Sequence, residues 1–449
     1  MLPPDLRDWV PKSHLAHYIL DAVEELDLSQ VRTNERGTGS EQYPPRMLLA
    51  LLIYSYATGT FSSRRIEQST YDNVAARLLT ADTHPDHDTI CVFRRENQAL
   101  LTQAFVRVLE LAQALKILQV GQITVSVDGT KVLANASKHA AVSYERAGKG
   151  IEQLELEVRE LVAKAEAADS APLQDGLSIP AEIERRQERR AQLAKARVEI
   201  EARAQARALA ERGEYERKLR ERNDKLGGGK GCYGPPPVPP DPEPRPTEQY
   251  NFTDPESRIM KGGRSTAFEQ CYNAQAAVEV QSRLIVGTRI ATSGNDQEQL
   301  VPTVRAIVPQ AGTVAAVLAD RGFYSEKAVK TLEGTAGSKP TGLTVYTAMG
   351  KMNHHRTVAD LEKQPEPAVP PPGSDVSAIM RYRLASAAGR AKYKLRQQTV
   401  EPVFGIIKEA MGFRRFRLRG RAKVTLEWTL VSLAYNLRRL HRLHQASPA

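Results

Sequence analysis

The chain has 449 residues, which favours two or three domains, and its formal net charge of +10 makes a polyanion a plausible partner. Its three cysteines are far apart and form no CxxC pair, which argues against a disulfide framework or a zinc ribbon and is typical of a reducing, cytoplasmic environment. The longest apolar run, residues 47–57, is too short to span a bilayer, and no signal peptide opens the chain, so we expect no membrane partner.

Residues 1–118 show helical periodicity and are predicted to form an all-helical N-terminal domain that binds DNA. Two helices joined through "TADTHPDHD" are typical of a helix-turn-helix, which would bring Arg94 and Arg95 to DNA. An ordinary helical bundle with solvated arginines explains the same pattern equally well. The joining segment also holds three side chains that could bind a metal, although a polar turn explains them better: His84, His87 and Asp88.

The period changes at residues 119–144, which are predicted to begin a second, α/β domain. Apolar residues alternate with polar ones from Ile123 to Val127, as they do in a strand. The Asp128-Gly129 pair that follows is expected to end this strand.

Residues 145–226 are rich in Glu, Arg, Ala and Leu, with apolar residues at coiled-coil spacing. They predict a charged helical hairpin inserted into the α/β domain, which serves as a spacer or a partner surface. Residues 227–250 are predicted to be a linker of flexible glycines followed by a stiff proline run.

Residues 251–449 are predicted to complete the α/β domain. Residues 267–281 and 283–292 indicate two strands around a turn, and Asp296 is expected to open a helix that ends at Val308. A buried strand, "TVAAVLAD", ends at Asp320, and helices close the chain. The short connections favour a mixed sheet with helices on its faces.

Three acids stand at informative places, because Asp128 and Asp320 follow strands and Glu401 lies near the start of a predicted helix. Each has a local explanation, as a turn residue or as an acid favoured at a helix N-terminus. Together, at one edge of a sheet, three carboxylates would need a cation, and Mg²⁺, with Mn²⁺ as a substitute, prefers such oxygen ligands. Metal-dependent phosphoryl transfer fits the basic chain, whereas glycoside hydrolysis by paired carboxylates leaves its arginines unexplained.

The segments "VSVDGTKV", "VLADRGFYS" and "TVEPVFGIIKEAMGFRRFRLRG" resemble the three motif regions of the DDE transposases of bacterial insertion sequences, whose catalytic domain has an RNase H-like fold. "PPRMLLALLIYSYATGTFSSRRIEQ" and "EWTLVSLAYNLRRL" are similar to a subgroup with a helical N-terminal domain. The resemblance implies Asp128, Asp320 and Glu401 as the catalytic, metal-binding triad. It also implies a double-stranded DNA substrate, binding of terminal inverted repeats, strand cleavage and strand transfer.

The signature that accompanies the third motif is Tyr, two residues, Arg, three residues, Glu, six residues, Lys. Here Tyr393 and Arg396 fit, four residues rather than three precede Glu401, and Lys408 fits again. We expect Pro402 to start or bend the helix at this point. The residues predicted to contact DNA are Lys408, Arg414, Arg415, Arg396, Tyr393, Arg94 and Arg95.

The alternative function is a catalytically silent, transposase-derived DNA-binding or regulatory protein. A structural coiled-coil protein would explain residues 145–226 alone. We expect a homodimer on DNA, in the bacterial cytoplasm and associated with the nucleoid when bound.

Overall fold

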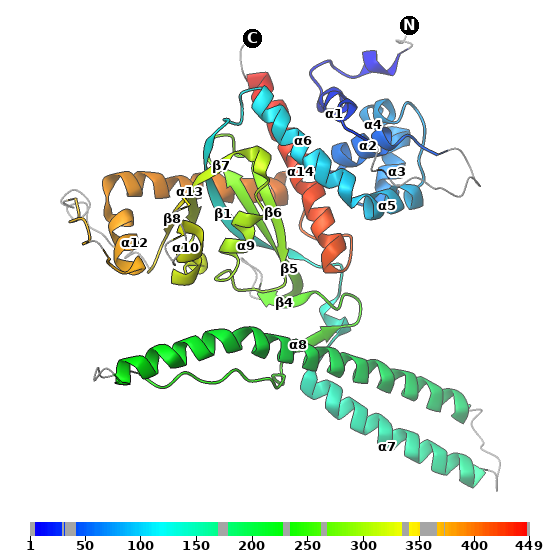
Figure 1. The fold of residues 1–449 in the computed structure, drawn as a ribbon. Coiled ribbons are helices and arrows are strands. Elements are labelled where there is room, and N and C mark those ends of the chain that lie inside the picture. The colour runs from blue at the N-terminus through cyan, green and yellow to red at the C-terminus, as the bar shows by residue number, and fades with distance from the viewer. Residues whose placement is uncertain are drawn as a thin grey trace. The chain divides into compact units, whose positions relative to one another are not determined.

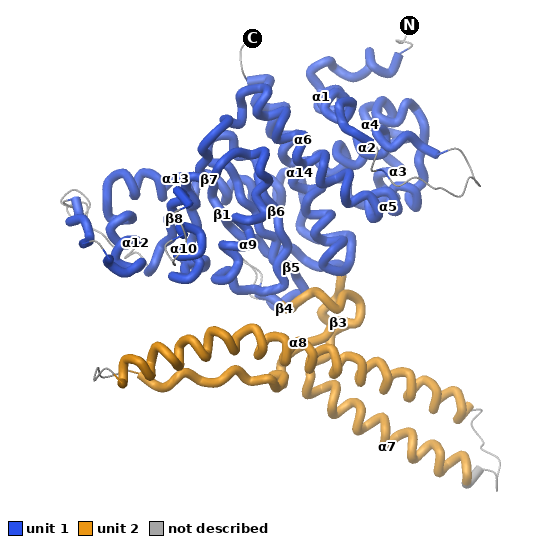
Figure 2. Tube along the Cα trace, viewed as in Figure 1, with its two compact units in different colours: residues 1–135, 260–449 blue, residues 136–259 orange. Residues whose placement is uncertain are grey.

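The structure is a computed structural model in which the chain divides into two compact units (Figures 1 and 2). Unit 1 comprises residues 1–135 and 260–449, and unit 2 comprises residues 136–259. The residues described are 5–28, 31, 42–168, 178–227, 234–261, 267–334, 341–350, 366–371 and 373–446.

The N-terminal part of unit 1 is helical, as predicted. After a 3-10 turn at Leu6–Trp9, its helices are α1 (Leu15–Glu24), α2 (Pro45–Ala57), α3 (Ser63–Asp72), α4 (Val74–Leu79), α5 (His87–Glu96) and α6 (Gln98–Ala114). α2 begins at Pro45, whose fixed φ suits a first helical turn and whose missing N–H would have no partner there. All of α2 from Met47 onward is buried, so this helix forms the centre of the helical core.

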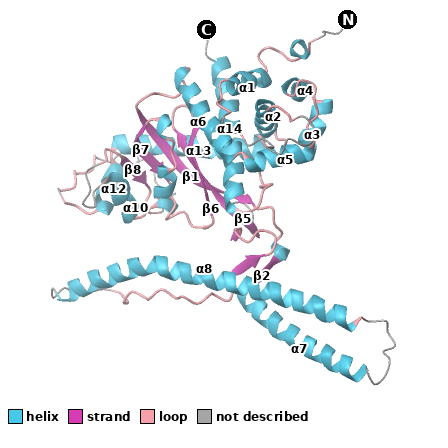
Figure 3. Cartoon of the chain, turned by 45° about the vertical axis from the view of Figure 1, so that its right-hand side comes forward, coloured by secondary structure: helices cyan, strands magenta, loops and turns pink. Residues whose placement is uncertain are grey.

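A six-stranded mixed sheet forms the rest of unit 1 (Figure 3). Its strands are β1 (Gln122–Leu133), β4 (Arg258–Lys261), β5 (Phe268–Glu279), β6 (Ile285–Ala291), β7 (Thr313–Ala319) and β8 (Thr344–Thr347). The order is β4-β5-β1-β7-β8. β6 lies off this path and pairs with β5 on the side away from β1. β1 runs antiparallel to β5 and parallel to β7. The prediction of a mixed α/β sheet is thereby confirmed.

The helices of this half flank the sheet: α9 (Leu300–Arg305), α10 (Glu326–Glu333), α12 (Val376–Ala385), α13 (Ala387–Gly405) and α14 (Arg421–Ala446), with 3-10 turns at Pro309–Ala311 and Arg321–Phe323. α13 packs against β1 and β7, and α14 packs against β6, α2 and α6. The fully buried Trp428 of α14 donates a hydrogen bond to the carbonyl of Gln275, 3.0 Å away. α14 therefore joins the sheet to the N-terminal helices. None of the helices in the described ranges has the length and apolarity needed to cross a bilayer.

Two elements differ from their predictions. β1 does not end at Asp128 but continues to Leu133, because Asp128 to Leu133 pair with β5 in unbroken register. The helix expected from Asp296 to Val308 is shorter, since α9 covers Leu300–Arg305. Asp296 therefore lies in the loop before α9.

Unit 2 contains the predicted helical hairpin, formed by α7 (Tyr144–Ala168) and α8 (Ile179–Gly227). The buried side chains of α8 are Ile179, Leu193, Ala196, Ile200 and Ala204. A two-stranded ribbon of β2 (Ala141–Ser143) and β3 (Gln249–Asn251) lies at its base. Tyr250 of this ribbon packs with Ala196 and Ile200, which gives the unit a small core of its own.

The proline-rich part of the predicted linker makes contacts with α8 of unit 2. Arg222 of α8 donates to the carbonyls of Gly234 and Pro235, and Arg207 pairs with Glu248. The extended segment therefore returns alongside α8 (Figure 1). Most of the glycines of the linker fall outside the described residues.

Candidate active site

The register of β1 and β7 places two of the predicted catalytic acids next to each other. Val127 of β1 is paired with Ala319 of β7, and the next residue on each strand is Asp128 and Asp320. The strands are parallel, so the two aspartates leave this pairing at the same edge. Val125, Ser126 and Val127 are all fully buried, so this part of β1 is covered on both faces of the sheet.

Asp128 sits in an electrostatically mixed environment. Its Oδ1 accepts a hydrogen bond from the N–H of Gly129 at 2.8 Å. Burial raises the pKa of the Asp128 carboxyl to about 7. Asp320 and Asp296 also raise this pKa, whereas the Gly129 N–H and the Arg396 guanidinium lower it. The carboxyl is therefore surrounded by both negative and positive neighbours, and a cation would favour its ionised form.

Asp320 caps the turn that follows β7. Its side chain accepts from the N–H of Gly322 at 2.6 Å, and its carbonyl accepts from the hydroxyl of Thr347 on β8 at 2.7 Å. Side chain and backbone are both held, so the carboxylate is fixed at the end of the buried strand. The prediction that a strand ends at Asp320 is confirmed by β7, whose last residue is Ala319.

Glu401 lies late in α13 rather than near the start of a helix, as the sequence had suggested. The helix begins at Ala387, where Ser386 accepts from the N–H of Gly389 at 3.1 Å. Pro402 is inside α13, and the chain continues after Gly405 as a π-helical turn at Ile406–Ala410. Pro402 thus neither starts nor ends the helix.

Arg396 links Glu401 to the strand acids. Its Nη2 lies 3.4 Å from Oε1 of Glu401, and its charge lowers the pKa of Asp128. The Glu401 side chain is 53% exposed, whereas that of Arg396 is 13% exposed. Arg396 therefore lies between the exposed glutamate and the buried edge of the sheet.

Tyr393 and Arg396 remain at the site despite the additional residue before Glu401. The Arg396 guanidinium lies 5.9 Å from the centre of the Tyr393 ring. Burial raises the pKa of Tyr393, Asp320 adds to this rise, and Arg396 opposes it. Both residues are therefore close to the acids.

Lys408 lies against the strand that carries Asp128. Its Nζ donates to the carbonyl of Lys131 at 3.0 Å, and it is half-buried. Burial lowers the pKa of Lys408, and Arg414 lowers it further. The negative charge of Asp128 reaches this ammonium and raises the pKa of Lys408.

Arg414 and Arg415, which were predicted to contact DNA, lie in a loop between α13 and α14, residues 413–420, here called the arginine loop. Its residues alternate between buried and exposed. Phe413 and Phe416 are fully buried, so these aromatic side chains belong to the core. The exposed side chains of the loop are Arg414, Arg415, Arg417 and Arg419. Arg414 pairs with Glu409, and Arg419 donates to the carbonyl of Asn135.

The structure does not place Arg94 on a DNA-facing surface. Arg94 is 4% exposed, and its Nη1 donates to the hydroxyl of Tyr56 at 3.0 Å and to the carbonyl of Phe61 at 2.9 Å. The prediction that it contacts DNA is therefore wrong, because its guanidinium is already used inside the helical core. Its neighbour Arg95 is exposed and pairs with Glu96.

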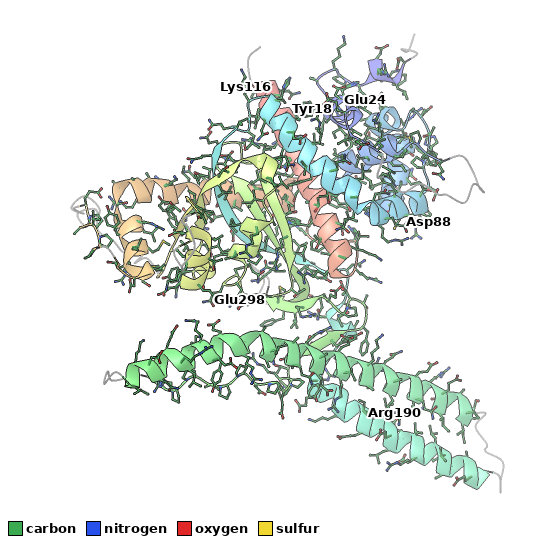
Figure 4. The ribbon with its side chains drawn as sticks, viewed as in Figure 1. Tyr18, Glu24, Asp88, Lys116, Arg190 and Glu298 are labelled. Atoms are coloured by element: carbon green, nitrogen blue, oxygen red, sulfur yellow. The ribbon has the colours of Figure 1, made fainter. Side chains whose placement is uncertain are left out.

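Two of the three possible metal ligands His84, His87 and Asp88 have contacts outside this group. The His84 ring stacks on Tyr71 at 3.9 Å, and Nδ1 of His87 lies 2.8 Å from a carboxylate oxygen of Glu67. Oδ1 of Asp88, an exposed residue in the first turn of α5 (Figure 4), lies 3.8 Å from Nε2 of His87.

A fourth acid was not predicted at the site. Oδ1 of Asp296 accepts hydrogen bonds from Asn273 and Gln275 of β5, and its charge reaches Asp128. No local pattern around Asp296 indicates this position, because its hydrogen-bond partners are on a different strand.

Asp128, Asp320 and Asp296 offer carboxylate oxygens, which are the ligands that a hard divalent cation prefers. Burial and the neighbouring negative charges raise the pKa of Asp128, and a bound cation would compensate for both effects. Across the described ranges, no three His, Cys, Asp or Glu side chains are already gathered closely enough to hold a metal ion. The strand acids are adjacent, and Glu401 is the member that stands apart with Arg396.

Two family models match the chain. One, described as the transposase DDE domain, covers residues 241–437, which include Asp320 and Glu401 but not Asp128. The other, described as a transposase domain (DUF772), covers residues 4–96 in the N-terminal helices. No curated protein and no solved structure matches the chain. The mixed sheet and its flanking helices agree with the RNase H-like fold of such domains. The chain therefore belongs to the DDE transposases of insertion-sequence type.

Proposed function

We propose that this chain binds the terminal inverted repeats of its insertion sequence and carries out metal-dependent DNA strand cleavage and strand transfer, with Asp128, Asp320 and Glu401 as the catalytic carboxylates. The observation that carries this proposal is the parallel register of β1 and β7, which sets Asp128 beside Asp320 at the sheet edge that α13 contacts. Family membership supplies the reaction class.

The chemistry is phosphoryl transfer. Bound Mg²⁺, or Mn²⁺ in its place, would activate the attacking oxygen and stabilise the leaving oxygen. In the first step water attacks a phosphodiester at the element end, a new P–O bond forms, and the bond to the 3′ oxygen breaks. In the second step the freed 3′ hydroxyl attacks a phosphodiester of the target DNA, and a target 3′ oxygen leaves. The two aspartates would hold the cation from rigid strand positions, and Glu401 would complete the ligand set from α13.

The DNA backbone is held by cationic side chains around the acids. Arg396 and Lys408 both interact electrostatically with Asp128, and the Tyr393 ring lies 5.9 Å from the Arg396 guanidinium. The exposed arginines of the arginine loop project from a base of buried Phe413 and Phe416. Arg95 of α5 is the exposed cation of the predicted recognition segment. Because these contacts release counterions, DNA affinity should fall steeply with salt.

A homodimer is proposed on the DNA, because an insertion sequence has two ends and one set of catalytic acids acts on one end at a time. The number of chains bound to DNA that carries both ends, measured by light scattering, tests this part separately. One chain per two ends would contradict it.

The test of the catalytic proposal is a nicking assay on DNA that carries the native element ends. Glu401→Gln, Asp128→Asn and Asp320→Asn each keep the side-chain shape and remove a charge. Each should retain DNA binding and lose cleavage by about 10²-fold or more, because metal ligation supplies several kcal/mol of transition-state stabilisation. Glu409→Gln is the matched control, since Glu409 is an exposed glutamate just beyond the same helix. A folded Glu401→Gln protein that nicks at the wild-type rate would refute the assignment.

One observation favours the second candidate, a catalytically silent DNA-binding or regulatory protein. Glu401 already pairs with the Arg396 guanidinium, whose Nη2 lies 3.4 Å from its Oε1. A wild-type chain that prefers terminal DNA over random duplex, yet nicks it at no concentration of Mg²⁺ or Mn²⁺, would establish this alternative.

A further inference from the structure

Asp296 lies between the glycines of two catalytic motifs. A Cβ atom added to Gly129 would stand 2.9 Å from Oδ1 of Asp296, and one added to Gly322 would stand 3.9 Å from its Cβ. Gly129 follows Asp128, and Gly322 follows Asp320 by two residues. Asp296 is therefore a neighbour of both strand acids, although it comes from the loop after β6.

The missing side chain of Gly129 gives Asp296 its access. A Cβ there would also meet Nε2 of Gln275 at 2.2 Å and Oδ1 of Asn273 at 2.7 Å, distances that no real side chain tolerates. Gln275 is the partner of Gly129 across the β1–β5 ladder. The Asp-Gly pair thus does not make a turn; its glycine lets two amides and a carboxylate reach over the strand beside Asp128.

These two amides orient Asp296. Nδ2 of Asn273 and Nε2 of Gln275 donate to the same oxygen, Oδ1, at 2.7 Å and 2.8 Å. Asn273 and Gln275 are two residues apart on β5 and so share one face of the sheet. Within the described part of the chain, Oδ2 of Asp296 makes no hydrogen bond, and one of its oxygens is therefore available in a fixed direction.

A second feature is an unpaired buried atom on the residue that holds Asp296. Gln275 is fully buried, and its Oε1 has no hydrogen-bond partner within the described ranges. A buried amide oxygen without a partner costs free energy unless something occupies it. Water molecules that accompany a hydrated cation would supply the missing donor.

We propose that Asp296 is a fourth carboxylate of the metal centre, held by Asn273 and Gln275 and directed toward the cation that Asp128 and Asp320 bind. This inference rests on the proposed function, because it assumes a cation at the strand acids. It adds a ligand that the family triad does not include. The competing explanation is that Asp296 merely anchors the loop before α9, where its carbonyl accepts from the N–H of Gln299.

Metal affinity, measured without catalysis, separates these explanations. Mn²⁺ binding to the full chain in the absence of DNA can be followed by electron paramagnetic resonance. Asp296→Asn keeps the shape and should weaken Mn²⁺ binding by about 10–100-fold. Gln275→Met removes the donor at similar volume and should give a smaller loss, because Asn273 still holds Oδ1. Glu298→Gln, two residues along the same loop and exposed (Figure 4), should bind Mn²⁺ like the wild type.

The metal dependence of nicking provides a second readout. Asp296→Asn should raise the Mn²⁺ concentration for half-maximal nicking while much of the maximal rate returns at saturation. A role limited to anchoring the loop would instead lower thermal stability and the maximal rate at every Mn²⁺ concentration. That pattern, or a folded Asp296→Asn protein with wild-type Mn²⁺ affinity, would overturn the inference.

The strand acids distinguish a failure of this inference from a failure of the proposed function. Asp128→Asn and Asp320→Asn should abolish Mn²⁺ binding in the same measurement. If both strand variants abolish Mn²⁺ binding and Asp296→Asn does not weaken it, the triad assignment is supported and Asp296 is not a metal ligand. If neither strand variant affects Mn²⁺ binding, the proposed metal centre itself is wrong.

Discussion

The hydroxyl of Tyr56 on α2 donates a hydrogen bond to the buried carboxylate of Glu427 on α14, 2.8 Å away. The other oxygen of Glu427 accepts from the backbone N–H groups of Arg417 and Leu418 in the arginine loop, at 2.8 Å and 2.9 Å. Arg94 of α5 completes the chain by donating to the Tyr56 hydroxyl. One buried carboxylate thus connects the N-terminal helices to the loop that carries the exposed arginines, and Arg94 acts inside this connection.

Tyr56→Phe should lower the free energy of unfolding by about 1.5–3 kcal/mol, because it removes a hydrogen bond to a buried charged group and leaves Arg94 without one acceptor. Chemical denaturation measures this. Tyr71→Phe is the control, since Tyr71 is an exposed tyrosine of the same helical part. Equal stabilities of the two variants would contradict a role for the Tyr56–Glu427 hydrogen bond in joining the two parts of unit 1.

Arg396→Gln should separate metal binding from catalysis. The guanidinium contacts Glu401 and lowers the pKa of Asp128, so its positive charge opposes a cation at the same place. Without it we expect Mn²⁺ to bind a few-fold more tightly, and nicking to fall by about 10²-fold because a phosphate ligand is lost. Lys394→Gln, which removes an exposed cation from the same helix, should alter neither. Weaker Mn²⁺ binding by Arg396→Gln would show that Arg396 supports the metal centre.

The strands were predictable where burial and pattern agreed. The apolar run of β7 and its end at Asp320 follow directly from the sequence, and so does the turn between β5 and β6. The predicted first strand ends at Asp128 because an Asp-Gly pair, taken by itself, favours a turn. In the fold, pairing with β5 keeps this segment extended, and the glycine serves close approach rather than a turn.

The remaining differences come from partners distant in sequence. Arg94 donates a hydrogen bond to the Tyr56 hydroxyl, which in turn donates to Glu427. No local sequence pattern around Arg94 indicates either contact. Asp296 has a helix-opening appearance in the sequence, but its oxygen is held by side chains of another strand. Ser386, the cap of α13, lies 15 residues before Glu401, whereas Pro402 is typical of a first helical turn and so indicates a helix start that the fold does not have.

The stability of the metal-free protein should depend on the pH through Asp128. The charged groups that face it are Asp320, Asp296, Arg396 and Lys408. Because its folded pKa, about 7, lies above the ordinary 3.8, the contribution to stability is complete below 3.8 and is lost as the pH rises through 7.

Asp128→Asn does not titrate at this position. Its stability relative to the wild type should therefore rise by about 1–2 kcal/mol between about pH 5 and pH 8 in EDTA, a figure reduced for the partial exposure of the carboxyl. Denaturant unfolding at both pH values measures the change. Mg²⁺ added at the higher pH should stabilise the wild type and not the variant. A difference between the two proteins that is independent of pH would contradict the raised pKa.

Deletion of unit 2 should leave the catalytic half of the chain folded. Unit 2 has its own small core of Ala196, Ile200 and Tyr250, so its removal takes no side chain from the centre of the sheet. The chain leaves β1 after Leu133, which is the ladder partner of Cys271 on β5, and β4 should be kept because it pairs with β5. Replacement of residues 137–257 by a flexible linker should shift the melting temperature of unit 1 by only a few degrees, because the free-energy cost of closing a loop depends weakly on its length.

Nicking of terminal DNA by this deletion protein should stay detectable, with the Asp128→Asn form of the same deletion as the inactive control. A deletion protein that folds and binds Mn²⁺ normally yet cuts no DNA would assign the hairpin a direct part in holding DNA or a second chain.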